Sequence, residues 1–238
     1  MSGENAGSSW GAAILGGAIG AVLMLAALLL AAQSGLFDRF VRQSLARQPE
    51  VLIETADLLR DKQMAPVVEQ HRTALETPFG SSWQGAQKPE VTLVEFYDYA
   101  CGYCRASLPV LDRLLKEDPG LRIVYREFPI LGPESEAASR LALAASKAGR
   151  FQQFHDAMYA AGRPASDTLQ KAAAAAGIPA QPLQSPEIDG ELRRNYQIAS
   201  ALGASGTPLF IVGDRVMNGA VGYEVLKKAI ADARAKQG

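Results

Sequence analysis

The sequence predicts an α/β domain in which a strand–helix–strand unit and a hairpin-plus-helix unit flank a helical block. Three observations lead to this prediction. Residues 91–128 alternate between strand-like and helical runs, and residues 134–203 hold four helical runs that each stop at a glycine. Residues 207–235 hold two short strand-like runs before a last helix.

The strand–helix–strand unit is defined by residue type. The run VTLVEFYDY (91–99) is rich in β-branched and aromatic residues, as is LRIVYREF (121–128), and both predict strands. Residues 105–117 between them repeat leucine at helical spacing and predict a helix. Two strands joined by one helix are expected to be parallel, with a right-handed crossover.

The charge balance argues against nucleic acid as a partner. The chain has 24 basic and 25 acidic residues, and 48% of its residues are hydrophobic. These values are typical of an ordinary globular protein, and there is no basic excess that would attract phosphate.

The N-terminal residues differ in kind from the rest. Residues 1–10 are predicted to be a short tail and residues 11–32 a transmembrane anchor, because that run contains only Gly, Ala, Ile, Leu, Val and Met. A helix of this length spans about 33 Å, enough for a hydrocarbon core of roughly 30 Å. A cleavable signal peptide is the alternative, since residues 32–34 offer a small-x-small site. Three arginines after the run, at positions 39, 42 and 47, would by themselves favour a cytoplasmic domain.

Residues 36–76 are predicted to be a helical segment that joins copies of the chain. Its apolar residues recur every three or four positions and predict one buried stripe: Leu52, Ala56, Leu59, Met64, Val68 and Leu75. Residues 77–89 are rich in Gly, Ser and Pro and are interpreted as a linker to a domain at residues 90–238. We therefore expect the stripe to form a homodimer or homotrimer. The alternatives are that it packs back on its own domain or lies along the membrane surface.

Cys101 and Cys104 are the only cysteines of the chain. A zinc site needs four ligands, and the two histidines, His71 and His155, lie far apart in the sequence, so no metal site is predicted. A structural disulfide would close a loop too small to stabilise the fold much. A CxxC pair beside a strand–helix–strand unit instead predicts thiol–disulfide chemistry on a thioredoxin-like fold.

The two cysteines are predicted to have different roles. Cys101 falls where the first strand ends and the helix begins, and there the free N–H groups and the helix dipole favour a thiolate. Cys104, one turn further on, is expected to be shielded. Cys101 is therefore the predicted nucleophile, and Cys104 is predicted to resolve the mixed disulfide that Cys101 forms with a substrate.

Glu95, Thr207 and Pro208 are further candidate site residues. Glu95 lies six residues before Cys101, in phase with the apolar positions of its strand, so we expect it on a buried face where it accepts the proton of Cys104. The alternative is that this face is solvated and Glu95 is merely exposed. Thr207-Pro208 begins a strand, where a cis peptide bond would suit a tight turn.

Four stretches of the sequence carry a family resemblance. They are VEFYDYACGYCRASLP, YREFPILGPESEAASRLALAA, FHDAMYAA and GASGTPLFIVGDRVMNGAVGYEVLKKAI. Together they resemble the DsbA-like thiol–disulfide oxidoreductases over about residues 90–238, and most of all the ScsC-type proteins, which carry a helical segment before this domain. The resemblance implies a thioredoxin fold with a helical insertion at about residues 133–203. It also implies a catalytic pair at Cys101 and Cys104, a cis-proline loop at Thr207-Pro208 and a buried acid at Glu95.

The resemblance also implies a cellular setting. Such proteins use no cofactor, act on cysteine-containing exported proteins in the bacterial periplasm and exchange electrons with a membrane redox partner protein. We therefore expect a single-pass inner-membrane protein with its domain in the periplasm, against the arginine count. The Gly-Tyr dipeptide between the cysteines and the threonine before the proline resemble disulfide isomerases and ScsC-type proteins more than the oxidase DsbA. Oxidase, isomerase and reductase thus stay open. The alternatives are a dedicated reductase for one metal-binding or cytochrome-assembly client and a non-catalytic surface or binding protein.

Overall fold

The computed structural model describes residue 24, residues 42–43 and 47, and residues 49–181 and 185–237. The chain divides into two compact units, residues 1–58 and residues 59–238, and the second contains the whole predicted catalytic domain. Within the described part of the chain, no helix has both the length and the apolar character needed to cross a membrane. The predicted tail, the predicted anchor apart from Met24, and most of residues 36–48 lie outside the described residues.

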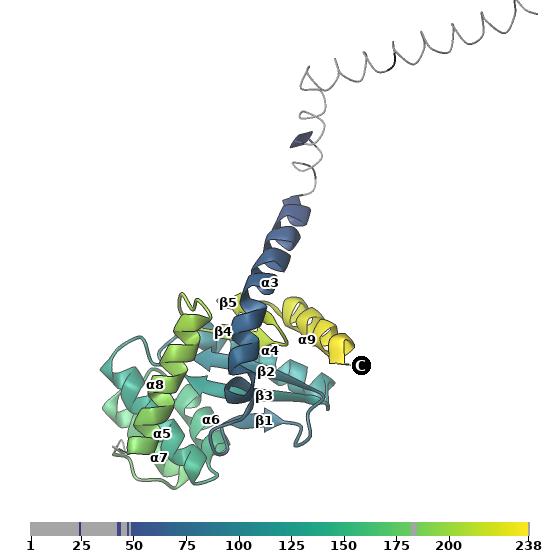
Figure 1. Cartoon of the computed structure of the whole chain (residues 1–238). Coiled ribbons are helices and arrows are strands. Elements are labelled where there is room, and N and C mark those ends of the chain that lie inside the picture. The colour runs from purple at the N-terminus through teal and green to yellow at the C-terminus, as the bar shows by residue number, and fades with distance from the viewer. Residues whose placement is uncertain (1–23, 25–41, 44–46, 48, 182–184, 238) are drawn as a thin grey trace, which may run out of the picture. The chain divides into compact units, whose positions relative to one another are not determined.

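A five-stranded mixed sheet forms the centre of the second unit (Figure 1). The strands lie in the order β1 (Trp83–Gly85), β3 (Leu121–Glu127), β2 (Val91–Tyr97), β4 (Leu209–Val212) and β5 (Arg215–Asn218). β2 and β3 run parallel, and every other neighbouring pair is antiparallel. The predicted parallel pair and the predicted C-terminal hairpin are both confirmed.

Helices connect and cover the strands as the sequence predicts. α4 (Gly102–Glu117) joins β2 to β3, and α9 (Tyr223–Gln237) follows the hairpin. The helical block contains α5 (Pro133–Lys147), α6 (Phe151–Ala161), α7 (Ser166–Ala176) and α8 (Pro186–Ala201). The glycines predicted to end these four helices all have a positive φ, between 65° and 113°, which other residues rarely adopt: Gly149, Gly162, Gly177 and Gly203.

Alternation along β2 divides the core into two clusters. Leu93 and Tyr97 project to the face covered by α4, α9 and α5–α7. Val94 and Phe96 project to the opposite face, which is covered by α3 (Pro49–Glu76) and α8. Because successive side chains of a strand point to opposite faces, a central strand that is buried on both faces needs a helical layer on each side.

The segment at residues 77–89 is not a linker, so this prediction is wrong. Residues 83–85 form β1, which pairs with β3 at the edge of the sheet. Gly80 and Gly85 have positive φ, and a Cβ on either would come within 2.6 Å of a backbone oxygen. Ser82 is buried and donates a hydrogen bond of 2.8 Å to the hydroxyl of Ser146 on α5. The small residues that suggested flexibility are needed for close packing.

The apolar stripe of α3 has a partner inside the domain, contrary to the prediction. Val68 and Leu75 are each 1% exposed, and Met64 packs against the same cluster on the outer face of β2 and β4. For this part of the stripe, the alternative of packing back on its own domain holds, because the sheet face needs a cover. Ala56 and Leu59 are exposed, the latter by 57%.

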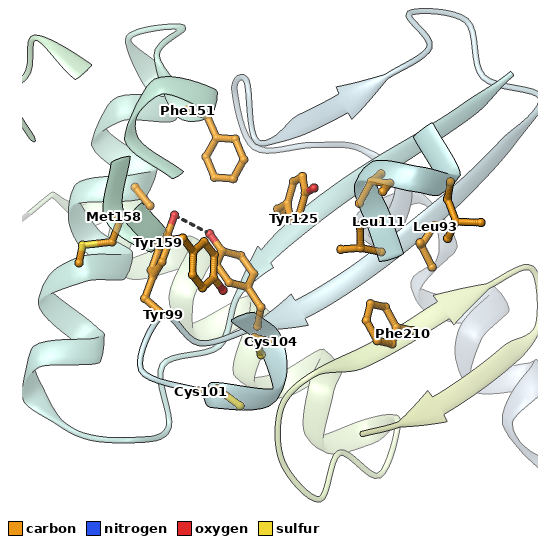
Figure 2. Packing of buried hydrophobic residues seen from close by; sticks show 14 of the residues in the cluster. Leu93, Tyr99, Cys101, Cys104, Leu111, Tyr125, Phe151, Met158, Tyr159 and Phe210 are labelled. Carbon is orange, nitrogen blue, oxygen red and sulfur yellow. Dashed lines mark hydrogen bonds between the residues drawn. The ribbon is translucent and has the colours of Figure 1, made fainter. Parts of the chain in front are cut away.

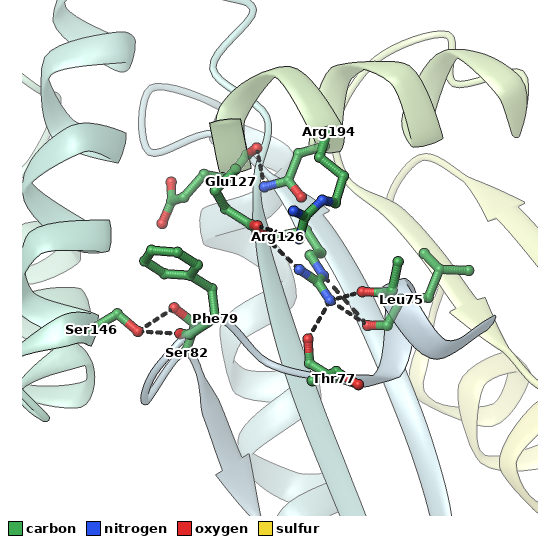
Figure 3. Close-up of polar contacts among 11 residues, drawn as sticks. Leu75, Thr77, Phe79, Ser82, Arg126, Glu127, Ser146 and Arg194 are labelled. Atoms are coloured by element: carbon green, nitrogen blue, oxygen red, sulfur yellow. Dashed lines mark hydrogen bonds and ion pairs between the residues drawn. The ribbon is translucent and has the colours of Figure 1, made fainter. Parts of the chain in front are cut away.

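Arg126 of β3 fixes the C-terminal end of α3 to the sheet (Figure 3). Its side chain is 2% exposed and donates hydrogen bonds to the carbonyl oxygens of Ala74, of Leu75 at 3.0 Å and of Thr77 at 2.6 Å. Its other amino group donates to Oε1 of Glu191 on α8 at 2.6 Å. One buried cation thus joins α3, β3 and α8, and its charge suits the carbonyl end of a helix.

Replacing Arg126 with methionine is expected to lower the free energy of unfolding by about 3–5 kcal/mol, because Glu191 would keep a buried charge without this partner. Urea unfolding measures the change. The matched control is Arg194→Met: Arg194 pairs with the same carboxylate at 3.2 Å, but its side chain is 58% exposed. That variant should lose about 0–1 kcal/mol. Equal losses in the two variants would contradict the anchoring role of Arg126.

Candidate active site

The two cysteines lie at the start of α4 (Figure 2). Cys101 is the N-cap residue, with φ −78° and ψ 119°, and Cys104 lies in the first turn. Both are free thiols; Cys101 is 7% exposed and Cys104 is 0% exposed. The helix begins at Gly102 rather than at the predicted residue 105, because its first turn carries none of the leucines from which the helix was predicted.

The loop before β4 lies against Cys101. The peptide bond between Thr207 and Pro208 is cis, as predicted. Cys101 Sγ donates a hydrogen bond to the carbonyl oxygen of Thr207 at 3.2 Å, across 106 residues of sequence. The contact brings the Cys101 sulfur next to the backbone of the cis-proline loop.

Glu95 is buried, so the predicted position of its side chain on an inner face is confirmed. It is 2% exposed, and its pKa is raised well above the usual value by burial first and then by Cys101 and Glu127. Burial also raises the pKa of the Cys104 thiol far above its usual range, and nearby Glu95 adds to that effect. A thiol in this setting needs a base close by. Glu95 is a carboxylate whose pKa is displaced toward that of a thiol.

Asp98 holds the cysteine loop, and the sequence analysis missed it. Its carboxylate accepts hydrogen bonds from the backbone N–H of Ala100 at 2.7 Å, of Ile130 at 2.9 Å and of Leu131 at 3.0 Å. Its carbonyl oxygen accepts from the N–H of Cys101 at 3.0 Å. Asp98 therefore ties the cysteine loop to the loop after β3. A short acidic side chain directly after a strand is a turn signal that could have identified it.

A cluster of aromatic rings lies behind the cysteines, and Figure 2 shows several of them between α6 and the sheet. Its members are Tyr97, Tyr99, Tyr125, His155 and Tyr159. The centroid of the His155 ring lies 4.8–5.6 Å from the centroids of the four tyrosine rings. His155 is 2% exposed, and burial lowers its pKa to about 3. The imidazole is therefore neutral at physiological pH.

Glu127 is a second buried carboxylate on the inner face, and the sequence analysis missed it too. It is 1% exposed, and it accepts hydrogen bonds from the hydroxyl of Ser139 at 2.6 Å and from the hydroxyl of Tyr97. Burial raises its pKa to about 8, although the two hydrogen bonds act in the opposite direction. Period-two alternation from Tyr125 could have placed Glu127 on this face, but no sequence pattern indicated its partners.

Residues 92–231 match the family model of the DSBA-like thioredoxin domain. Among curated proteins, the chain is similar to Na(+)/H(+) antiporter NhaA 3 of Salinispora tropica, with 29% identity over 159 residues. That alignment covers 63% of this chain and 24% of the antiporter. The chain thus spans about a quarter of the length of the curated relatives it matches.

Solved structures share the fold over most of their own length. A thioredoxin-like oxidoreductase of Silicibacter pomeroyi is 35% identical with a TM-score of 0.64, covering 69% of this chain and 98% of that one. A periplasmic thioredoxin-like protein of Salmonella enterica serovar Typhimurium is 28% identical with a TM-score of 0.63, covering 69% and 95%. ScsC of Proteus mirabilis in a transitional conformation is 26% identical with a TM-score of 0.66, covering 87% and 97%.

The free energy of unfolding is expected to depend on pH through His155 and Glu127 with opposite signs. His155 stays neutral in the fold down to about pH 3 but gains a proton near 6.5 when unfolded, so its contribution is present above pH 6.5 and is lost as pH falls toward 3. Glu127 keeps its proton in the fold up to about pH 8 but loses it near 4.5 when unfolded. Its contribution is therefore present below pH 4.5 and is lost as pH rises toward 8. Each slope is roughly 1.4 kcal/mol per pH unit.

Urea unfolding over this pH range, with single variants, separates the two contributions. Below pH 4.5 only His155→Gln is expected to reduce the slope, and above pH 6.5 only Glu127→Gln; between these values the two contributions have opposite signs. A wild-type acid limb in His155→Gln, or a wild-type alkaline limb in Glu127→Gln, would contradict the assignment of that residue.

Proposed function

The chain belongs to the DsbA-like thioredoxin domain family, and we propose that it forms, isomerises or reduces disulfides in exported proteins through Cys101 and Cys104. It is a thiol–disulfide oxidoreductase. One observation carries the proposal. The more exposed of two free cysteines at a helix N-terminus lies 3.2 Å from the carbonyl oxygen that precedes a cis-proline. Substrate and resolving cysteine can then approach the same sulfur from different sides.

The first step is the attack of Cys101 on a substrate disulfide. Its sulfur lies where the free N–H groups and the dipole of α4 favour negative charge, which activates it as a nucleophile. A bond forms between Cys101 Sγ and one substrate sulfur, while the substrate S–S bond breaks and the other sulfur leaves as a thiolate.

The second step is the attack of Cys104 on the mixed disulfide. Cys104 loses its proton to Glu95, and its thiolate then bonds to Cys101 Sγ and releases the second substrate sulfur. Two electrons have then passed from the cysteine pair to the substrate, which is reduced. The reverse sequence oxidises a substrate. When another substrate cysteine resolves the mixed disulfide, the result is isomerisation.

The proposed location is the periplasmic side of the bacterial inner membrane, with residues 11–32 as a single-pass anchor. The apolar character of that run and the similarity to a periplasmic protein of Salmonella support it. Disulfide exchange with exported proteins also requires an oxidising compartment. A membrane redox protein would return the cysteine pair to its working state.

A dedicated reductase for one metal-binding or cytochrome-assembly client is the second candidate. The dipeptide Gly102-Tyr103, rather than that of DsbA, is the observation that favours it over an oxidase. The equilibrium with glutathione distinguishes the two, since a potential near about −120 mV is that of an oxidant and one near about −270 mV is that of a reductant. A non-catalytic binding protein is less well supported, because both thiols, the cis-proline and a buried acid occur together.

Removing either thiol tests the catalytic proposal. Cys104→Ser is expected to accumulate mixed disulfides with substrate proteins, because the resolving thiol is gone, and Cys101→Ser is expected to accumulate none. Both variants should lose reduction of insulin by dithiothreitol, measured as turbidity, relative to the wild type. Wild-type insulin reduction in Cys101→Ser would refute the proposed nucleophile, and no reduction by the wild type would favour a binding protein.

We also propose that the chain is a homodimer or homotrimer through the exposed part of α3, which includes Leu59. A chain of residues 36–238 is expected to form an assembly of two or three copies by light scattering, and a chain of residues 60–238, which lacks Leu59, is expected to be a monomer. The shorter chain keeps Met64, Val68 and Leu75, so its sheet stays covered. Because linked sites raise the effective concentration at one client, isomerase activity should fall in the shorter chain while insulin reduction stays. Monomers in both chains would remove the argument for isomerisation.

A further inference from the structure

Four buried side chains form one continuous line of hydrogen bonds. The hydroxyl of Tyr97 contacts Oε1 of Glu127 at one end and lies 3.0 Å from the hydroxyl of Tyr99. The hydroxyl of Tyr99 lies 3.2 Å from Nδ1 of His155. All four residues are less than 3% exposed, so water does not compete for these contacts. The line runs from the inner face of the sheet to α6.

His155, at the far end of the line, also lines a pocket. No partner among the described residues reaches Nε2 of His155. His155 lines a pocket of about 310 Å³ between α4, α6 and the sheet, whose polar lining includes Arg105, Asp112 and Asp156. A buried ring nitrogen without a protein partner, in a residue that lines a partly polar pocket of this size, can exchange a proton with water.

Each tyrosine has one proton, so the charge of Glu127 sets the direction of every bond. When Glu127 is ionised, Tyr97 must donate to it, because the two oxygens are too close to meet without a proton. Tyr99 must then donate to Tyr97, and His155 must donate from Nδ1 to Tyr99. The second nitrogen of the neutral ring, Nε2, then carries no proton.

When Glu127 is protonated, every bond reverses. Oε1 of Glu127 donates to Tyr97, Tyr97 donates to Tyr99, and Tyr99 donates to Nδ1 of His155. The ring proton then lies on Nε2. Ser139 can donate to Oε2 of Glu127 in both states, so it does not oppose the change.

We propose that Glu127, Tyr97, Tyr99 and His155 form a proton relay, in which a proton taken up at Nε2 of His155 from the pocket appears on the carboxyl group of Glu127. Three protons each move along one hydrogen bond: from Nδ1 to Tyr99, from Tyr99 to Tyr97, and from Tyr97 to Glu127. One proton enters and one carboxylate is neutralised, so charge balances. The imidazole changes tautomer and is neutral before and after the transfer.

The surrounding groups are compatible with such a relay. Glu127 is faced by Glu95 and Tyr97 of β2, by Asp98 just after β2, by Ser139 of α5 and by Tyr159 of α6. His155 is faced by its four tyrosine neighbours, by Arg105 and Asp112 of α4 across the pocket, and by Asp156 of α6. Burial first, and the negative charge of Glu127 second, raise the pKa values of Tyr97 and Tyr99 well above the usual value. Both tyrosines therefore begin and end as neutral hydroxyls.

The relay bears on catalysis through Glu95, and this part rests on the proposed function. Glu95 and Tyr97 lie on one face of β2, and Tyr97 is opposite Glu127 in the parallel register. A negative charge on Glu127 disfavours a second negative charge on Glu95. Protonation of Glu127 through the relay would thus leave Glu95 freer to ionise and to accept the proton of Cys104. Glu127 is a positioning residue in this sense, since it acts through Glu95.

Nitrogen-15 NMR of the histidine ring in the full chain tests the relay directly. His155 should be neutral from about pH 6 to about pH 10, and its unprotonated nitrogen should change from Nδ1 to Nε2 as pH rises through about 8. The chain has two histidines, so His71→Gln leaves the signals of His155 alone. One unchanged tautomer across this range, or a charged ring within it, would overturn the relay in the wild-type protein.

Variants separate the relay from general effects on the fold. Glu127→Gln removes the titrating group and Tyr97→Phe breaks the line, so in both the tautomer should not depend on pH. The matched control is Tyr125→Phe, which removes the hydroxyl of another ring beside His155 that bonds to Gln84 at 2.9 Å. That variant should keep the tautomer change. Loss of the change in Tyr125→Phe, or its persistence in Glu127→Gln, would overturn the proposal.

The link to catalysis has its own readout. The rate at which Cys104 resolves a mixed disulfide is compared between the wild type and Glu127→Gln at about pH 6 and about pH 9. The wild type should become slower relative to the variant at the higher pH, because only its Glu127 gains a charge. A constant ratio would overturn the link to Glu95 and leave the relay standing. A missing tautomer change in an active enzyme would overturn the relay and leave the proposed function standing.

Discussion

Two consecutive residues of β3, Arg126 and Glu127, have ionisable side chains that are buried and directed to opposite faces of the sheet. Arg126 donates to the end of α3 and to Glu191 of α8, and Glu127 accepts from Tyr97 and Ser139 on the inner face. A strand alternates with a period of two, so a shift of β3 by one residue would reverse both side chains. Each would then lie in an apolar layer without its hydrogen-bond partners, at a cost of roughly several kcal/mol for each ionisable side chain. The pair therefore fixes the register of the sheet on which the other elements are placed.

The register between β2 and β3 determines where the catalytic groups lie. β2 pairs in parallel with β3 so that Tyr97 lies opposite Glu127, and this places Glu95 on the same inner face, two residues earlier. The end of β2 then sets Asp98, whose carboxylate connects the cysteine loop to Ile130 and Leu131 after β3. Those two residues are 39% and 50% exposed, and Tyr103 between the cysteines is 70% exposed. The Asp98 carboxylate, by binding backbone N–H groups, thus holds the exposed apolar residues Ile130 and Leu131 beside the cysteine loop.

The parts of this molecule that could be predicted from sequence are those that local patterns determine. Strand and helix runs, four glycines in left-handed conformation, and the CxxC pair at a strand–helix junction all depend on near neighbours. The predictions of a linker at residues 77–89 and of an apolar stripe on α3 without a partner in the domain were wrong, because composition does not show which surface a segment packs against. Residues 80, 82 and 85 are small because they pack closely against α5 and the sheet. Val68 and Leu75 cover a face of β2 that needs a cover only once the sheet is assembled, so a local pattern does not reveal their partner. Asp98, Glu127 and His155 were missed for the same reason. Their roles depend on hydrogen-bond partners that lie 12 to 56 residues away in the sequence.

The inner face contains more polar chemistry than a dithiol pair needs. Two carboxylates, four tyrosines and a histidine are buried within one core, and burying polar groups is costly unless each finds a partner. Here most of these polar groups form hydrogen bonds with one another. The line from Glu127 to His155 has two arrangements of its protons in which every hydrogen bond is satisfied. An apolar core of the same volume would be as stable or more so, and it would not respond to pH. The response to pH therefore favours a role for the network in proton transfer at the site. Cys104 requires such a transfer, because it is a buried thiol that must lose a proton before it reacts.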